Sequence, residues 1–263
     1  MTRAIVVVDM VRGFLEEGHP LYCGAKARAI IPAIQKLLER ELKRGAKVFY
    51  PCDRHKPDDP EFKMFPPHCI EGTPEAELIP ELSQYPGEII PKERFDAFYG
   101  TPLEKKLKGL NPEVVVVCGV CTDICVLHTV ASARNRGYRV EVPVDCVATF
   151  DSQAHLFALN HLEKVLGAEL IRPKVSLAKP RFEIPDAWLS GETADIYFPR
   201  TVEILRKEGL NPVATMEVFP NRAGILCGMA EVKALLARVL PKGNREVWAL
   251  DEGDAMDAKE VVL

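Results

Sequence analysis

Nowhere does the sequence hold the run of ~20 apolar residues that a membrane-spanning helix requires. Residues 1–4 lead straight into a strand-like segment, without the charged and apolar regions of a signal peptide. Positive charge is not in excess either, because 34 lysines and arginines face 38 aspartates and glutamates. These absences argue against membrane insertion, secretion and electrostatic binding of nucleic acids or anionic membranes. We expect a cytoplasmic protein whose partners include a small molecule.

The sequence also lacks a disulfide or zinc-finger framework. Its eight cysteines would suffice for four disulfides, but several lie inside or beside apolar strand-like runs of a chain without a secretion signal. Cys118 and Cys121 form a Cys-x-x-Cys pair, yet no second pair completes a zinc site, and the motif straddles the end of a predicted strand. We therefore expect free thiols.

Strand-like and helix-like segments alternate over about the first 170 residues. The predicted strands are 4–8, 47–50, 88–90, 114–118 and 138–142, and the predicted helices are 25–44, about 123–136 and 152–166. Such alternation favours a parallel sheet with connections that lie on its faces. The fold class is therefore α/β, with three layers in which helices cover both faces of a central parallel sheet.

The pattern changes at residues 172–186, where prolines and basic residues punctuate the chain as in a linker. We predict a first domain at residues 1–175 and a small α+β module at residues 187–263. The module is expected to have helices at about 193–208 and 229–239, and strand-like pieces at 214–219, 246–250 and from Val261 onward.

Two charged residues stand at predicted strand ends. Asp9 ends the first strand, and the carboxyl ends of parallel strands are where open α/β sheets build their sites. Its carboxylate can be a general base there, or simply a helix or turn cap. Lys92 follows the strand at 88–90. Most lone lysines are solvated surface charges, so Lys92 has a functional role only if it reaches the same pocket as Asp9. There it could stabilise a thiolate and developing negative charge.

Cys125 follows the most apolar strand, after a glycine-containing turn that leads into a helix. In the first helical turn, free backbone N–H groups and the helix dipole favour a thiolate near neutral pH. The same N–H groups can form an oxyanion hole. The alternative for Cys125 is a small core residue, which is the interpretation we favour for Cys118.

Ligand-type residues cluster after the second strand, at Asp53, His55, Glu61 and His68. Asp-x-His places two side chains on the same side of an extended segment. Two imidazoles and two carboxylates suit zinc, manganese or iron(II), with positions left for water. Loops gather these residue types for other reasons too, so spacing alone leaves both interpretations open.

These residues resemble a known family. Asp9, Lys92 and the turn Gly-Val-Cys-Thr-Asp-Ile-Cys-Val at residues 119–126 resemble the catalytic signature of the isochorismatase-like cysteine hydrolases. Asp53-x-His55, Pro-Pro-His-Cys at residues 66–69 and Glu-Gly-Thr-Pro at residues 71–74 resemble the metal loop of its nicotinamidase branch. The resemblance spans about residues 4–172.

The resemblance implies a nicotinamidase that hydrolyses nicotinamide to nicotinate and ammonia and so feeds NAD salvage. Cys125 would attack the amide carbonyl and form a thioester, with Asp9 accepting the thiol proton and Lys92 supporting the thiolate. Backbone N–H groups of Cys121 and Cys125 would form the oxyanion hole. The bond between Val120 and Cys121 would be a cis peptide.

The resemblance further implies a divalent metal, zinc before manganese or iron, held by Asp53, His55, Glu61 and His68. The metal would hold the pyridine nitrogen, and Phe14 and Phe65 would enclose the ring. The sequence departs from the family in two places. The residues before Phe14 are Val-Arg-Gly instead of a polar stretch, and no second histidine stands near residues 58–61. Glu61 is therefore assigned as third ligand, with Asp59 in reserve.

Residues 191–201 and 214–218 resemble the N-terminal region of nicotinate phosphoribosyltransferases, which consume nicotinate. The phosphoribosyl-binding barrel is not expected in this chain, and neither is transferase activity. The module at 187–263 either docks a phosphoribosyltransferase partner or is a small structural or dimerising appendage. The alternatives for the chain are another small-amide hydrolase of this fold, or a subunit that docks such a barrel. We also expect a homo-oligomer.

Overall fold

The computed structural model describes residues 2–172, 186–190, 197–209, 216–240, 247–250, 253–256 and 261–262. The chain divides into two compact units, Met1–Pro173 and Lys174–Leu263. No helix in these described ranges has the length and apolarity needed to span a bilayer.

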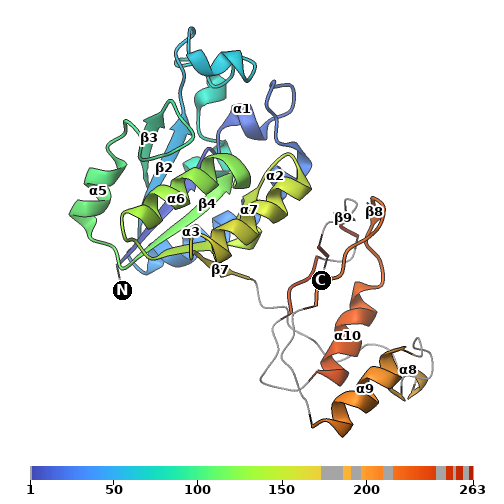
Figure 1. The fold of residues 1–263 in the computed structure, drawn as a ribbon. Helices are drawn as coiled ribbons and strands as arrows, with labels where there is room; N and C mark the ends of the chain where they lie inside the picture. The colour runs from blue at the N-terminus through green and yellow to red at the C-terminus, as the bar shows by residue number, and fades with distance from the viewer. Residues whose placement is uncertain are drawn as a thin grey trace. The chain divides into compact units, whose positions relative to one another are not determined.

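A parallel sheet forms the centre of the first unit, in the strand order β3-β2-β1-β4-β5-β7 (Figure 1). The strands are β1 (Arg3–Val8), β2 (Lys47–Asp53), β3 (Glu88–Lys92), β4 (Val114–Val120), β5 (Val140–Pro143) and β7 (Glu169–Ile171), and the short β6 (Val147–Ala148) pairs with the end of β4. The runs of valine in β1 and β4 are buried, because both faces of a parallel sheet are covered.

Helices cover both faces of the sheet, which confirms the predicted three-layer α/β class. The longer ones are α3 (Ile31–Lys43), α5 (Leu103–Leu110), α6 (Leu127–Asn135) and α7 (Ser152–Lys164). The short ones are α1 (Arg12–Leu15), α2 (Gly24–Ala29) and α4 (Pro80–Ser83). There are also the tight 3-10 turns η1 (Pro60–Lys63), η2 (Pro74–Ala76) and η4 (Val144–Cys146), and a wider π-helical turn, η3 (Thr122–Val126). Because the strand order runs outward in both directions from β1 and β4, right-handed crossovers put α3 on one face and α6 and α7 on the other.

Several predicted elements have different bounds in the structure. The single helix predicted at 25–44 is two helices, α2 and α3, and Pro32, which has no N–H to donate, lies in the first turn of α3. The helix predicted from about 123 begins as the wider η3 turn and becomes regular only at Leu127. The strand predicted at 138–142 begins at Val140, and α5, β6 and β7 were not predicted.

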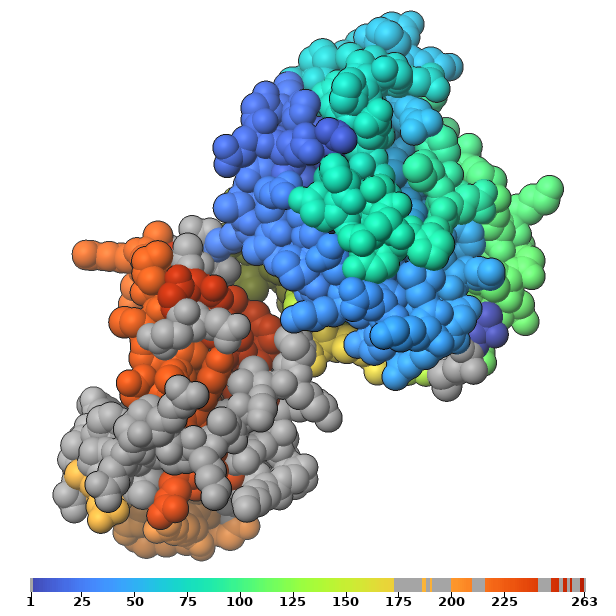
Figure 2. Space-filling model, turned by 180° about the vertical axis from the view of Figure 1, so that it is seen from behind, coloured from blue at the N-terminus to red at the C-terminus, as the bar shows by residue number. Residues whose placement is uncertain are grey.

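The strand register sets the position of the functional residues. Asp53 and Lys92, the last residues of β2 and β3, are direct partners in the ladder. Much of the connection between β2 and β3 lies at the end of the first unit where the strands finish, and its last residues return along α4 to the start of β3 (Figure 1). Figure 2 shows the opposite face of the same unit. A site at the carboxyl ends of the strands is therefore covered by this connection.

The second unit contains α8 (Asp186–Ser190), α9 (Tyr197–Lys207) and α10 (Met229–Val239), with β8 (Gly224–Ile225) antiparallel to β9 (Ala255–Met256). Among the described residues of this unit, Leu226, Met229 and Val262 form a small buried apolar core. The sequence predicted strands at 214–219, 246–250 and 261 onward. The structure has no strand at the described parts of these ranges, which are 216–219, 247–250 and 261–262, so the prediction is wrong there. Residues 214–215, 246 and 263 lie outside the described residues. Single backbone hydrogen bonds join these stretches, from the N–H of Leu250 to the carbonyl of Val262 (3.0 Å) and from the N–H of Val262 to the carbonyl of Val218 (2.8 Å), but the strand pair of this unit is the short β8–β9.

Candidate active site

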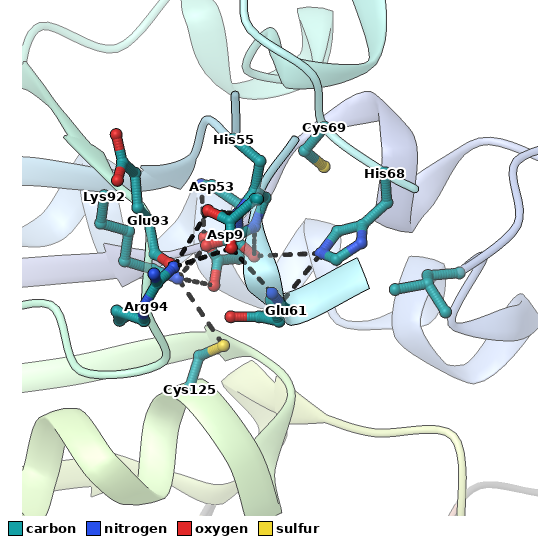
Figure 3. A network of polar contacts seen from close by, with 12 residues as sticks. Asp9, Asp53, His55, Glu61, His68, Cys69, Lys92, Glu93, Arg94 and Cys125 are labelled. Atoms are coloured by element: carbon teal, nitrogen blue, oxygen red, sulfur yellow. Dashed lines mark hydrogen bonds and ion pairs between the residues drawn. The ribbon is translucent and has the colours of Figure 1, made fainter. Parts of the chain in front are cut away.

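Three strand ends bring Asp9, Asp53 and Lys92 together (Figure 3). Asp9 follows β1 directly and has a left-handed backbone (φ 52°), an uncommon conformation for an aspartate. Its N–H donates to the carbonyl of Pro51 (2.8 Å), and its Oδ1 accepts the N–H of Asp53 (2.9 Å). All three side chains are buried, so their charges must be balanced within the site.

Lys92 provides that balance. Its Nζ lies 2.7 Å from Asp9 Oδ2, bonds Asp53 Oδ1 and stands 3.7 Å from Cys125 Sγ. Burial lowers the pKa of Lys92, but the two carboxylates outweigh it and raise the pKa well above the ordinary value. Lys92 is therefore a permanent ammonium shared by two carboxylates.

Cys125 lies in the η3 turn beyond the end of β4. Gly119 (φ 111°) passes so close to β1 that an added Cβ would be 2.0 Å from the carbonyl oxygen of Val8. The peptide bond between Val120 and Cys121 is cis, as the resemblance implied. The sulfur of Cys125 and one oxygen each of Asp9 and Asp53 lie within 4.8 Å of one another. The close approach of β4 to β1 thus places the thiol beside the carboxylates.

The expectation of a Cys125 thiolate at neutral pH is wrong. Burial first, and then the charges of Asp9 and Asp53, raise the pKa of Cys125 well above its ordinary value. Lys92 opposes this shift, but its charge is already engaged by two carboxylates. Burial and the charge of Asp53 raise the pKa of Asp9 to about 6 against the effect of Lys92. At neutral pH the sulfur therefore holds the proton, next to an ionised Asp9.

A second cluster joins the first through Asp53. Its other oxygen, Oδ2, lies 3.6 Å from His55 Nε2 and 3.8 Å from His68 Nε2, and Glu61 Oε1 lies 3.9 Å from His68 Nε2. These separations are too long for hydrogen bonds. They are close to the ~3.4 Å spacing expected of ligands around a zinc ion with bonds of about 2.1 Å. Asp53, His55 and His68 thus offer ligand atoms within 4.8 Å of one another, and Glu61 reaches this group at His68.

The imidazole nitrogens of this cluster are arranged for a cation. His55 Nδ1 bonds Asp59 (3.1 Å) and His68 Nδ1 bonds the carbonyl of Pro66 (2.9 Å), which leaves each Nε2 toward the centre. His55 Nε2 is buried and has no hydrogen-bond partner among the described residues. Burial lowers the pKa of His55, but the Asp53 and Asp59 carboxylates raise it to about 9. The negative field that holds a proton there equally favours a divalent cation, so the donor set fits a metal.

The loop that carries His68 is tied to His55 by backbone bonds. The His55 N–H donates to the carbonyl of Cys69 (3.0 Å), and the His55 carbonyl accepts the N–H of Glu71 (2.8 Å). The two imidazole rings consequently meet edge to face, with centroids 4.7 Å apart.

Aromatic rings flank this cluster. Phe14 lies 5.6 Å and Phe65 lies 6.4 Å from the His68 ring, between centroids. Two further rings were not predicted. Phe62 packs on both imidazoles (5.5 and 5.6 Å), and Phe95 stands 6.1 Å from Phe65. Phe95 could have been predicted from its position three residues after Lys92, because the segment that follows the same strand carries both residues.

The site contains the features of an acyl-transfer centre beside a cation site. Residues 3–172 match the family model described as the isochorismatase domain. The chain belongs to the isochorismatase family. As a member of it, the chain is an amidohydrolase. Residues 195–263 match a second model, the N-terminal domain of quinolinate phosphoribosyl transferase, which confirms the resemblance of the C-terminal module to such enzymes.

Relatives of the isochorismatase-family chain cover its first unit. It is 35% identical over 181 residues to an uncharacterized isochorismatase family protein, PncA, of Bacillus subtilis, covering 65% of this chain and 99% of the relative. It is 35% identical over 178 residues to Nicotinamidase 1 of Arabidopsis thaliana, covering 58% of this chain and 71% of the relative.

Solved structures show the same fold. The nicotinamidase PncA from Bacillus subtilis superposes with a TM-score of 0.62 at 34% identity, covering 65% of this chain and 100% of that one. The pyrazinamidase of Pyrococcus horikoshii in complex with zinc gives a TM-score of 0.60 at 30% identity, covering 64% of this chain and 98% of that one.

Proposed function

We propose that the chain is a nicotinamidase, which hydrolyses nicotinamide to nicotinate and ammonia. The observation that carries the proposal is the junction at Asp53, where one carboxylate serves both the Lys92 cluster and the two histidines. A reacting amide at Cys125 and a ring nitrogen near the histidines would then lie a few ångströms apart, as in a small aromatic amide. Phe14 and Phe65 flank the same region and would enclose the ring.

In this mechanism the thiol of Cys125 passes its proton to Asp9 as the sulfur attacks the amide carbonyl. Backbone N–H groups of Cys121 and Cys125 would stabilise the oxyanion. Asp9 then returns the proton to the leaving nitrogen, ammonia departs, and a thioester remains on Cys125. Asp9 next takes a proton from the attacking water, nicotinate leaves, and the sulfur regains its proton. The positive charge of Lys92 helps Asp9 to be ionised before each of the two attacks, by the sulfur and by the water.

Asp53, His55, Glu61 and His68 would hold a divalent cation, and zinc is our first choice because a pyrazinamidase with a similar structure is in complex with zinc. When bound, such a cation supplies a Lewis acid that can accept the pyridine nitrogen and orient the ring. The cytoplasmic location, the homo-oligomeric state and a place in NAD salvage stay predictions.

The test is ammonia release from nicotinamide by the purified full chain beside Cys125→Ala, with and without a chelator. We expect activity in the wild type, loss of at least ~10³-fold in the variant, consistent with loss of a nucleophile, and loss on metal removal that zinc restores. Activity that ignores the chelator would remove the metal from the proposal. An inactive, zinc-loaded wild type would direct the assay to other amides, since the N-carbamoylsarcosine amidase of Thermoplasma acidophilum also has a similar structure.

For the second unit we propose docking to a phosphoribosyltransferase barrel, which would use the nicotinate formed. Support comes from the family model at residues 195–263 and from exposed apolar side chains such as Met216, Phe219 and Ile225. The measurement is co-elution of the full chain with a nicotinate phosphoribosyltransferase barrel in size-exclusion chromatography. We expect a complex that Met216→Ser with Ile225→Ser weakens. Separate elution at tens of micromolar would instead support a structural appendage.

A further inference from the structure

Asp59 bonds two members of the metal cluster and one arginine at once. Its side chain is 2% exposed. Oδ2 lies 3.1 Å from His55 Nδ1, and Oδ1 accepts the backbone N–H of Glu61 (2.9 Å). Arg94 Nη1 donates from 3.0 Å to each of the two oxygens. Both oxygens of Asp59 are therefore engaged.

The contact with His55 determines which ring nitrogen is available. A carboxylate only accepts, so the bond requires a proton on Nδ1 and leaves Nε2 to face Asp53 and His68. A carboxylate on the distal nitrogen of a histidine also orients the ring and increases its basicity as a ligand. Asp59 thus prepares His55 for a cation without touching the cation itself.

The contact with Glu61 determines where the third ligand lies. Asp59 caps the η1 turn, and because Pro60 has no N–H, the N–H of Glu61 is the first donor that the turn offers. Holding this N–H sets the start of the turn whose carboxylate reaches to 3.9 Å from His68 Nε2. One side chain therefore positions two members of the cluster.

Arg94 comes from the segment that follows β3, two residues beyond Lys92, as Figure 3 shows. The side chain of Arg94 is 38% exposed, whereas that of Asp59 is buried, so Arg94 neutralises the carboxylate from the solvent side. For Asp59 to bind a metal directly, it would have to release His55, the Glu61 N–H or Arg94. An oxygen of Asp59 lies within 4.8 Å of ligand atoms of His55 and Glu61, so the direct-ligand role stays the alternative that the experiment below decides.

We propose that Asp59 is the positioning residue of the metal site and that Arg94 anchors it, an inference that rests on the proposed metal-assisted function. Through this pair the strand end that carries Lys92 is joined to the loop that carries the metal ligands. Asp59 acts through His55 and Glu61, and loss of its carboxylate weakens metal binding while the ligand set stays the same.

The experiment measures zinc affinity of the full-length protein by competition with a chromophoric chelator, and the visible spectrum of the cobalt(II) form. We expect Asp59→Asn to weaken zinc binding by about 10–100-fold, as for other residues that orient ligands, with a cobalt spectrum like that of the wild type. Arg94→Met is expected to weaken binding in the same direction by less, because Asp59 remains. Asp58→Asn, at the exposed neighbour, is the matched control and should bind as the wild type.

Glu61→Gln is the reference for loss of a ligand, and its cobalt spectrum should change. If Asp59→Asn changed the spectrum in the same way, Asp59 would be a ligand and the inference would be wrong. Zinc affinity within twofold of the wild type in Asp59→Asn would overturn it as well. If that variant does not fold, Arg94→Met decides, and unchanged affinity there counts against the pair. A wild type that binds no zinc is a different result, because it removes the proposed metal function itself.

Discussion

At the scale of single residues, the site is organised around one ammonium and the carboxylates that share it. Lys92 bonds Asp9 and Asp53, and its remaining attraction for Cys125 does not offset burial and two negative charges. The resting thiol is therefore protonated, and nucleophilic attack needs a proton acceptor next to the sulfur. Asp9, whose pKa is about 6, is ionised at neutral pH and close enough to take that proton.

This arrangement leads us to expect opposite changes in two properties of Asp9→Asn. Since the charge of Asp9 raises the pKa of Cys125, its removal lowers that pKa and increases the thiolate fraction at pH 7.5. Alkylation of Cys125 by iodoacetamide should become several-fold faster than in the wild type, while amidase activity is lost by about 10²-fold or more. Mass spectrometry of the alkylated chain and ammonia release measure the two properties.

Both chains would carry Cys227→Ser, because Cys227 is the one exposed cysteine in the described part of the chain. Cys125→Ala gives the background of the other thiols. Slower alkylation in Asp9→Asn would show that Asp9 already deprotonates the resting thiol, contrary to the electrostatics described above.

At the scale of elements, the strands and strand ends that depend on runs of apolar residues were predicted from the sequence. The apolar runs of β1 and β4 and the residues at strand ends, Asp9 and Lys92, were found from pattern alone, because buried parallel strands read as continuous apolar segments. The break between α2 and α3 and the short β7 were not found, because they depend on a single proline and on pairing with a distant strand.

The site residues, like the elements, could be predicted only in part from the sequence. Residue type and spacing were enough to name the candidates Asp53, His55 and His68. They could not show that Asp59 occupies the outer nitrogen of His55, or that Lys92 is divided between two carboxylates. Those features depend on side-chain directions across three strand ends, and a linear pattern does not encode them.

The close approach of β4 to β1 leads to a prediction about the effect of a glycine substitution on stability. Gly119→Ala combines a positive φ of 111° with a Cβ 2.0 Å from the Val8 carbonyl oxygen, so β1 or β4 would have to move. Gly137→Ala is matched to it, with a φ of 82° and nothing within 4 Å of the added Cβ. We expect Gly137→Ala to lower the free energy of unfolding by about 1 kcal/mol, and Gly119→Ala by at least ~2 kcal/mol more, as for other steric conflicts in packed backbone.

The free energies come from denaturant unfolding followed by far-ultraviolet circular dichroism. Tryptophan fluorescence does not serve, because Trp188 and Trp248 both belong to the second unit. Equal losses in the two variants would mean that β4 can shift away from β1 at little cost, contrary to the tight contact at Gly119.

At the scale of the whole molecule, the two units are unequal. The first contains all the residues proposed for catalysis and metal binding, and it has a large continuous core. It also corresponds to complete relatives, since the alignment with the Bacillus subtilis nicotinamidase structure covers 100% of that chain. Among its described residues, the second unit has a small buried core around Leu226, Met229 and Val262. The proposed chemistry and the larger of the two described cores therefore belong to the first unit.

A chain that ends at Pro173 should consequently fold and keep its amidase activity. We expect kcat/KM for nicotinamide within about threefold of the full chain, because every residue proposed for catalysis or metal binding belongs to the first unit. Cys125→Ala in the shortened chain is the control for contaminating activity, and thermal unfolding with and without zinc shows whether the metal site is intact. A shortened chain that is folded and binds zinc, yet has lost more than tenfold in kcat/KM, would mean that the second unit contributes to the reaction as well as to docking.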